Sequence, residues 1–429
     1  MNNRFTEHNS DLLCERYFEV VHPSGLKIIV FPKRLTTTYA LLGVRYGAIN
    51  NNFFVGENEI SVPDGIAHFL EHKLFTNEDG SDSFERFSMF GADANAYTSF
   101  NKTAYLFSCT ENWQASLGEL IDFVTHPYFT PESVASEIGI IKEEIKMYDD
   151  SPSDRCFYGM LEGMYKNHSI KRNICGSAQS ISQITPEMLY SCYNSFYNLS
   201  NMVLAISGDV DPDEALSVAD AHLPNAPSAF LTRTVDENAA ESPCVASPLV
   251  ENKMQISKPI FNIGFKDINI PKDPYERQKK DATMAILDEI IFSRAGALYN
   301  SLFERNIISP NLSYGYSISA NAAYNSVAGE ADDPSLVLEE IMKHIEALRS
   351  NGLPYEDFVR GKRVMYAEFV KSFDSTDNIA NNLFAFFCEN SELLSYADIL
   401  DSVSYEDVCD QFKKCFDRES VTLSVVKPL

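Results

Sequence analysis

The sequence has no long apolar run and no cysteine pattern that suggests a disulfide framework. No stretch approaches the ~18 uninterrupted apolar residues of a membrane span, and residues 1–20 contain no apolar core of signal-peptide length. The nine cysteines are odd in number and include no Cys-x-x-Cys pair, a usage that favours a reducing compartment. We therefore expect a cytoplasmic protein that is neither exported nor embedded in a membrane.

Positive charge is also scarce. The chain has 35 Lys and Arg against 61 Asp and Glu, a net charge of −26, and no basic run of five or more residues. This balance argues against binding to nucleic acid or to an anionic membrane surface, because both need clustered cations. It is compatible with cationic peptide partners, although a solvated acidic surface is the simpler explanation.

The length of 429 residues is enough for two or three domains with large cores. Strand-like runs open and close each half of the chain, and helical patterns lie between them. The runs are residues 25–32, 38–47 and 201–210 in the first half and 252–257, 259–265 and 420–426 in the second. The stretch 224–248 contains four prolines and few large apolar residues, so we expect a linker there.

The two halves also share a sequence pattern. Residues 64–75, "DGIAHFLEHKLF", align without gaps with residues 281–292, "DATMAILDEIIF". The tripeptide Phe-Glu-Arg at 84–86 recurs at 303–305. We interpret these matches as an ancient duplication. The predicted fold is therefore α+β, with two duplicated halves that each form a mixed, mostly antiparallel sheet with helices packed on one face.

Two histidines and a glutamate stand out in the first of these aligned segments. His68 and His72 are four residues apart, so in a helix their side chains project from one face, and Glu71 lies beside them. Two imidazoles and a carboxylate at this spacing can hold a zinc ion and activate its water. A lone histidine on an apolar helix face is more often packed or surface-exposed, but the pair with an intervening glutamate favours a metal site.

The second aligned segment keeps the helix pattern but not the ligands. At the positions of the first histidine, the glutamate and the second histidine it has Ala285, Asp288 and Glu289. The metal is therefore assigned to one half only. We expect a metal-bearing catalytic half at 1–223, the linker at 224–248 and a homologous half without metal ligands at 249–429.

A third ligand can be sought in another helical pattern, residues 130–150. Thr130 followed by Pro131 makes a good N-cap and first turn, and a stripe of apolar residues at helical spacing follows. Glu137 and Glu144 are seven residues apart and hence on a common face, so that one could ligate a metal while the other orients a histidine. Taken alone, the segment is more simply an ordinary acidic amphipathic helix.

Together these segments resemble the inverzincin family, the pitrilysin- and insulinase-like zinc peptidases, which carry the motif His-x-x-Glu-His. The similarity covers nearly the whole chain and is greatest to the half-size bacterial members. Residues 91–108 resemble the family's edge strand, whose backbone aligns the substrate. Residues 196–212 resemble the strand that closes its first domain.

The resemblance implies one zinc ion per chain. His68, His72 and Glu144 would hold it and leave a fourth position for water. Glu71 would take the proton of this water as general base and pass it to the leaving amine. Glu137 would hydrogen-bond a ligand histidine and fix its orientation.

The third ligand is the least determined of these residues. His72 and Glu144 are 72 residues apart, slightly fewer than in the family. The adjacent Glu143 is an alternative ligand. The pairing with Glu137, seven residues earlier, favours Glu144.

The same resemblance implies how substrate binds. Asn95, Ala96 and Tyr97 would bind a peptide by strand addition, through main-chain hydrogen bonds with little readout of sequence. Such an enzyme cuts extended peptides or unfolded segments enclosed between two halves. We therefore expect a zinc-dependent endopeptidase.

One departure from the family pattern concerns the second half. Full-length members supply an arginine and a tyrosine there, seven residues apart, which hold the substrate and stabilise the oxyanion. Here the arginine position holds Phe303, and Tyr314 and Tyr316 come eleven and thirteen residues later, while Arg305 is out of register. We therefore expect a heterodimer with a related subunit that lacks zinc ligands and supplies this pair. A homodimer is the alternative assembly.

A non-catalytic scaffold or processing subunit of an insulinase-like complex is the alternative function. Family members have taken that role after losing their ligands. The intact histidines and glutamates argue against it, whereas the missing arginine–tyrosine pair argues for it. A purely structural zinc site fits poorly, since such sites favour four protein ligands rich in cysteine.

Overall fold

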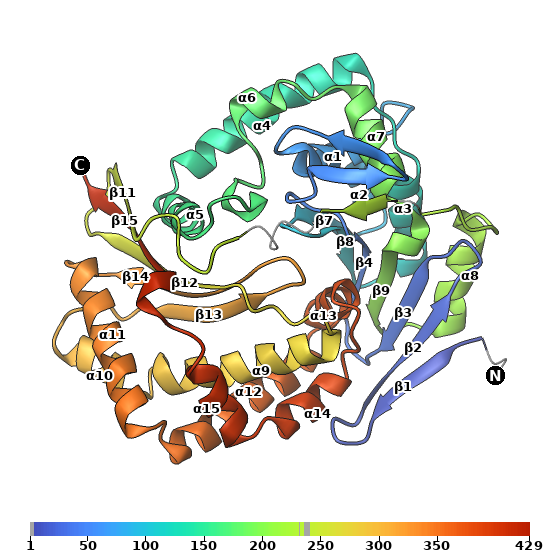
Figure 1. The fold of residues 1–429 in the computed structure, drawn as a ribbon. Helices are drawn as coiled ribbons and strands as arrows, with labels where there is room; N and C mark the ends of the chain where they lie inside the picture. The colour runs from blue at the N-terminus through green and yellow to red at the C-terminus, as the bar shows by residue number, and fades with distance from the viewer. Residues whose placement is uncertain (1–3, 231, 236–240) are drawn as a thin grey trace. The chain divides into compact units, whose positions relative to one another are not determined.

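The computed structural model describes residues 4–230, 232–235 and 241–429 (Figure 1). Part of the linker expected at 224–248 therefore lies outside the described residues, namely 231 and 236–240. No helix within the described ranges is long and apolar enough to cross a membrane. The chain divides into two compact units, each built on its own sheet.

The first unit comprises residues 1–145, 173–235 and 370–395. Its main sheet has seven strands, and all neighbours are antiparallel except β3 and β9, which are parallel. In sheet order the strands are β1 (Thr6–Ser10), β2 (Glu15–Val21), β3 (Lys27–Pro32), β9 (Met202–Gly208), β4 (Thr38–Val44), β8 (Thr103–Cys109) and β7 (Asp93–Thr98). A smaller sheet has the order β10 (Thr232–Thr234), β5 (Asn52–Val55) and β6 (Asn58–Ser61).

The core of the first unit lies around the central strands β4 and β9. Every residue of these two strands is buried, which explains their nearly continuous apolar sequences. The helices of the unit are α1 (Ile66–Leu74), α2 (Ser83–Met89), α3 (Trp113–Thr125), α4 (Pro131–Asp149), α6 (Ala178–Ile181), α7 (Pro186–Phe196), α8 (Pro212–His222) and α13 (Thr376–Cys388). The last residues of α4 continue into the second unit.

The second unit comprises residues 146–172, 236–369 and 396–429. In sheet order its strands are β11 (Leu249–Met254), β15 (Val421–Pro428), β12 (Ile260–Asp267), β14 (Ala323–Glu330) and β13 (Ser313–Ile318), with only the first pair parallel. Its helices are α5 (Pro152–Met164), α9 (Pro274–Ile291), α10 (Ala297–Glu304), α11 (Pro334–Asn351), α12 (Tyr355–Lys371), α14 (Ser395–Ser402) and α15 (Tyr405–Phe412). The predicted α+β class with two similar halves is confirmed.

The compact units do not coincide with the two halves of the sequence. Each unit includes one helix that comes from the other half of the sequence. Helix α13, from the second half of the sequence, packs on β4 and β9 of the first unit. Helix α5, from the first half, packs on β12 and β15 of the second unit, where Met160 lies against Gly264. In the first unit Phe384 lies so close to Gly43 that a Cβ there would be 2.4 Å from the ring. A glycine is therefore required where the exchanged helix meets the sheet.

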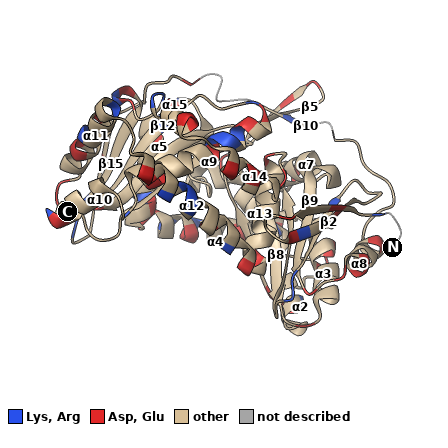
Figure 2. Cartoon of the chain, turned by 90° about the horizontal axis from the view of Figure 1, so that it is seen from below, with Lys and Arg blue, Asp and Glu red and all other residues tan. Residues whose placement is uncertain are grey.

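Charged residues of both signs are distributed along the helices of both units (Figure 2). Figure 2 shows Lys and Arg alternating with Asp and Glu along the helices, among them α4 and α11, while much of each sheet carries neither kind. This distribution agrees with a solvated acidic surface and with the absence of a basic run in the sequence.

Candidate metal centre

Helix α1 carries the two histidines and is fixed by its apolar side. Its buried apolar residues are Ile66, Ala67, Phe69, Leu70 and Leu74. The helix begins after Gly65, which has φ 90° and lies so close to the Cys175 carbonyl that a Cβ would be 2.4 Å from its oxygen. Only glycine fits this helix start, because it combines a positive φ with a close backbone approach.

The three predicted zinc ligands lie together in the first unit. Nε2 of His68 is 3.5 Å from Oε1 of Glu144, and Nε2 of His72 is 3.4 Å from Oε2 of the same carboxylate. One ligand atom from each residue lies within 4.8 Å of the other two. Two imidazole nitrogens and a carboxylate oxygen are a donor set that zinc prefers, so the residues present fit this metal.

The alternative ligand Glu143 lies outside this cluster. Its side chain is exposed on α4, whereas Glu144 faces the histidines. Neighbouring residues of a helix point about 100° apart, so only one of the two can face α1. Within the described residues, this is the only group of His, Cys, Asp or Glu with metal-binding geometry.

Glu137 lies beside the second histidine, which also faces Glu144. Nδ1 of His72 is 3.1 Å from Oε1 of Glu137, and Nζ of the buried Lys73 is 3.4 Å from Oε2. Burial lowers the pKa of His72, but the hydrogen bond with Glu137 and the nearby carboxylates raise that pKa overall. Burial likewise opposes ionisation of Glu137, yet His72 and Lys73 bring its pKa below the usual value.

The first histidine has a less polar environment. Its Nδ1 is buried and has no hydrogen-bond partner among the described residues. Its Nε2, which faces Glu144, is 3.8 Å from Sγ of the buried Cys175. The sequence patterns give no indication of this cysteine, because it is 107 residues from His68 along the chain.

Glu71 is buried next to the ligand cluster. Oε2 of Glu71 accepts a hydrogen bond of 2.6 Å from the hydroxyl of Thr98 on β7. Burial raises the pKa of Glu71 above its ordinary value, although both histidines and the Thr98 hydrogen bond partly oppose this shift. A carboxylate with a raised pKa is suited to accept a proton near neutral pH.

Strand β7 carries the predicted peptide-binding residues at the edge of the sheet. Among the described residues its one sheet neighbour is β8. The Asn95 side chain is exposed and accepts the backbone N–H of Ala96 at 2.8 Å. The side chain of Tyr97 points elsewhere, since its hydroxyl donates to Oδ1 of Asn381 on α13 at 2.9 Å. A contribution of Tyr97 to peptide binding would therefore come from its backbone.

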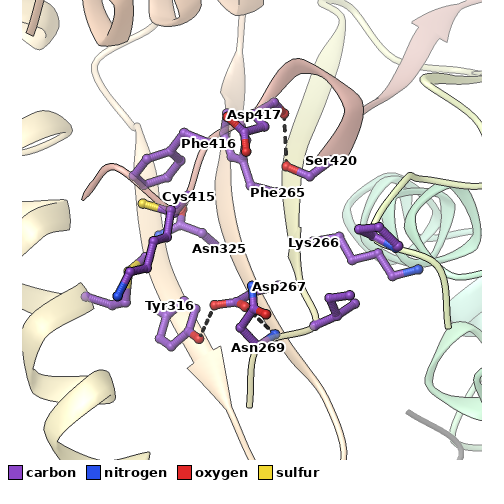
Figure 3. Close-up of a pocket in the computed structure, with 14 residues that line it drawn as sticks. Phe265, Lys266, Asp267, Asn269, Tyr316, Asn325, Cys415, Phe416, Asp417 and Ser420 are labelled. Atoms are coloured by element: carbon purple, nitrogen blue, oxygen red, sulfur yellow. Dashed lines mark hydrogen bonds between the residues drawn. The ribbon is translucent and has the colours of Figure 1, made fainter. Parts of the chain in front are cut away.

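Arg305, Tyr314 and Tyr316 were considered above for substrate contact. In the structure their side chains bind acidic residues of the second unit itself. Arg305 forms an ion pair with Glu340, and Tyr314 donates to Glu289. Tyr316 donates to Oδ2 of Asp267 at 2.8 Å in a pocket between β12 and the segment before β15 (Figure 3). These contacts agree with the poor register of the residues in the sequence.

The counterpart of Glu71 in the second unit has a different environment. Asp288 on α9 is buried, and its Oδ1 accepts from Nδ2 of Asn325 at 2.5 Å. Burial raises the pKa of Asp288 far above the usual value. Asn325 also lines the pocket of Figure 3. The position that corresponds to Glu71 in the second unit is therefore held by a buried acid paired with an amide.

Comparisons with known proteins match both parts of the chain to one family of peptidases. The family model "Insulinase (Peptidase family M16)" matches residues 57–178, which include α1 and α4, and "Peptidase M16 inactive domain" matches residues 183–365. A relative from Bacillus subtilis (strain 168), named "Uncharacterized zinc protease YmfH", is 37% identical over 420 residues, which are 97% of either chain.

Solved structures share the fold over the full length. An M16-like peptidase from Alicyclobacillus acidocaldarius is 30% identical, with 100% of both chains covered and a TM-score of 0.91. A protease from Helicobacter pylori is 16% identical, with 96% of this chain and 100% of that chain covered and a TM-score of 0.81, a likeness of fold alone. The chain therefore belongs to the insulinase family of peptidases, peptidase family M16.

Proposed function

We propose that this chain is a zinc-dependent endopeptidase that hydrolyses extended peptides or unfolded segments. The observation that carries the proposal is the convergence of His68, His72 and Glu144 beside the buried Glu71. The name of the Bacillus subtilis relative, a zinc protease, supports the choice of metal. One zinc ion per chain, held by the two imidazoles and the Glu144 carboxylate, would lower the pKa of a water and polarise the peptide carbonyl.

Glu71 is the proposed general base. Its Oε2 is held by Thr98, which leaves Oε1 to accept the proton of the attacking water. The protonated carboxyl would then donate to the leaving amine, so that one residue acts first as base and then as acid.

Two further residues set the geometry of the ligands and the peptide. Glu137 accepts from Nδ1 of His72 and so directs Nε2 of that ring toward Glu144. The outer edge of β7, which pairs with no strand in the described part of the chain, would add the peptide as a further strand at Asn95 and Ala96. To bind, the peptide has to compete with the Asn95 side chain for the N–H of Ala96.

We further propose that the chain is the catalytic subunit of a dimer. Arg305 pairs with Glu340 and Tyr314 donates to Glu289, so neither side chain is available to stabilise an oxyanion. This supports a partner that supplies the oxyanion-stabilising arginine and tyrosine. A related subunit without zinc ligands is the preferred partner, and a second copy of this chain is the alternative. The competing function is a scaffold without catalytic activity. It is favoured because position 303, where the family pattern has an arginine, is Phe303.

Zinc content measured together with peptide cleavage tests the proposed function. The chain is purified alone and together with any insulinase-like chain encoded beside it. Zinc near one per chain, with cleavage that requires the partner, is the expected result. Cleavage by the chain alone would support the homodimer. If neither preparation contains zinc or cleaves the peptide, the chain is a scaffold instead.

A further inference from the structure

Strand β7 is held from both faces of the first sheet. Successive side chains of a strand point to opposite faces, so Tyr97 and Thr98 face opposite ways. Thr98 reaches Glu71 on α1, and Tyr97 reaches Asn381 on α13. The exchanged helix therefore contacts the strand that carries the proposed peptide-binding edge.

The register of the sheet places Tyr97 on the face that α13 covers. Tyr97 pairs with Ala104 of β8, and Ala104 pairs with Gly43 of β4, so all three lie on one face. Gly43 is the residue on which Phe384 of α13 packs. The contact between Tyr97 and Asn381 thus follows from the packing of α13.

The amide of Asn381 uses both of its polar atoms. Oδ1 accepts from Tyr97, while Nδ2 donates to the hydroxyl of Tyr39 at 3.1 Å and to the carbonyl of Asp377 at 2.9 Å. Tyr39 lies on the buried central strand β4. Asn381 therefore links the edge strand β7 to the centre of the sheet without passing through β8.

Helix α13 is packed tightly against the sheet, so it can hold β7 in place. Besides the contact of Phe384 with Gly43, the guanidinium of Arg45 stacks 3.9 Å from the centroid of Phe387. Nζ of Lys102, in the turn between β7 and β8, lies 5.5 Å from the ring centroid of Phe384. Both ends of the β7–β8 connection are therefore near this helix.

We propose that Asn381 is a positioning residue for peptide binding, which holds β7 through Tyr97 so that its edge is set to receive an extended peptide. The inference rests on the proposed function. It assigns to the C-terminal half of the sequence a part in the site that the N-terminal half carries. Edge strands are held on one side only, so a fixed anchor on the sheet face lowers the cost of ordering the strand when peptide binds.

The test compares Asn381→Ala with two tyrosine variants in steady-state cleavage of an unstructured fluorogenic peptide, using the preparation that shows zinc-dependent cleavage. Asn381→Ala and Tyr97→Phe each remove the bond to β7 and are expected to raise KM about tenfold, the effect of one hydrogen bond, with little change in kcat. Tyr39→Phe removes only the bond to β4 and is the matched control, with KM near that of the wild type.

The double variant Asn381→Ala/Tyr97→Phe separates this role from general damage. If the two residues act through one bond, the double variant has the KM of either single variant. Hydrogen exchange of the free chain is expected to quicken in β7 and to remain slow in α13. Unchanged KM in both single variants, or a fall in kcat alone from partial unfolding, would overturn this inference and leave the proposed function standing. A wild-type chain without zinc-dependent cleavage would overturn both.

Discussion

The hydroxyl of Thr98 donates to the buried carboxylate of Glu71 at 2.6 Å, and this bond joins strand β7, the proposed peptide-binding strand, to the proposed base. The two residues belong to different elements, β7 and α1, 27 positions apart. Through the bond, the position of the proposed peptide-binding edge and the orientation of the proposed base are set together. The same bond also lowers the pKa of Glu71 against the effect of burial.

Replacing Thr98 by valine removes this bond with little change in shape. The Thr98 bond lowers the pKa of Glu71, so its loss raises that pKa further, and less of the base is ionised at acidic pH. We expect kcat to fall about tenfold or more, as for a hydrogen bond to a charged group, and the acidic limb of the kcat/KM profile to move to higher pH. Thr98→Ser keeps the hydroxyl and should resemble the wild type. An unshifted acidic limb in Thr98→Val would contradict this role.

Replacing Glu137 by alanine tests whether this carboxylate supports His72 as a proposed zinc ligand. Loss of the carboxylate leaves Nδ1 of His72 without its acceptor, and we expect zinc affinity to fall about 10–100-fold. The exposed Glu143 on the same helix is the matched control, so Glu143→Ala should bind zinc like the wild type. Competition with a chromogenic chelator measures both. A large loss of affinity in Glu143→Ala would instead make that residue the ligand.

The buried carboxyl of Asp288 is expected to make the stability of the folded chain depend on pH. Its pKa in the folded chain lies far above the ordinary value of ~3.9, so its contribution to stability is complete below that value and is lost as the pH rises toward the folded pKa. Asp288→Asn cannot ionise and keeps an acceptor for Asn325. We expect a higher melting temperature than the wild type in alkaline buffer and a smaller difference in acidic buffer. An equal difference at every pH would show that Asp288 does not titrate as described.

Gly43 tests the packing of the exchanged helix. Gly43→Ala places a Cβ against Phe384, and such overpacking is expected to cost about 1–3 kcal/mol of stability. Gly315→Ala, on β13 of the second unit, is the control, because a Cβ added there would meet no other atom within 4 Å. Denaturant unfolding compares the two variants. If Gly43→Ala and Gly315→Ala are equally stable, α13 can shift to make room for the added methyl group at little cost.

The parts of the site that depend on local spacing could be predicted from the sequence. His68, Glu71 and His72 lie within five residues of one another on one helix, so helical periodicity alone brings them together. The seven-residue spacing in α4 and the family resemblance indicate Glu137 and Glu144. The structure places Glu144 near both histidines and Glu137 beside His72.

The contacts that the sequence did not predict join distant segments. Thr98, Cys175 and Asn381 are close to site residues only because of the fold, and none belongs to a local motif. The exchange of α5 and α13 is of the same kind. Each helix is amphipathic and has the pattern of any sheet-covering helix, so its sequence does not say which of two similar sheets it covers.

The most direct test of the central claim is Glu71→Gln, assayed for zinc and for cleavage in the same preparation as the wild type. Glutamine keeps the shape of the side chain but cannot accept the proton of the water. The account predicts zinc near one per chain, as in the wild type, with cleavage reduced at least about a hundredfold. Cleavage at the wild-type rate with zinc bound would contradict the assignment of Glu71 as the base of this peptidase.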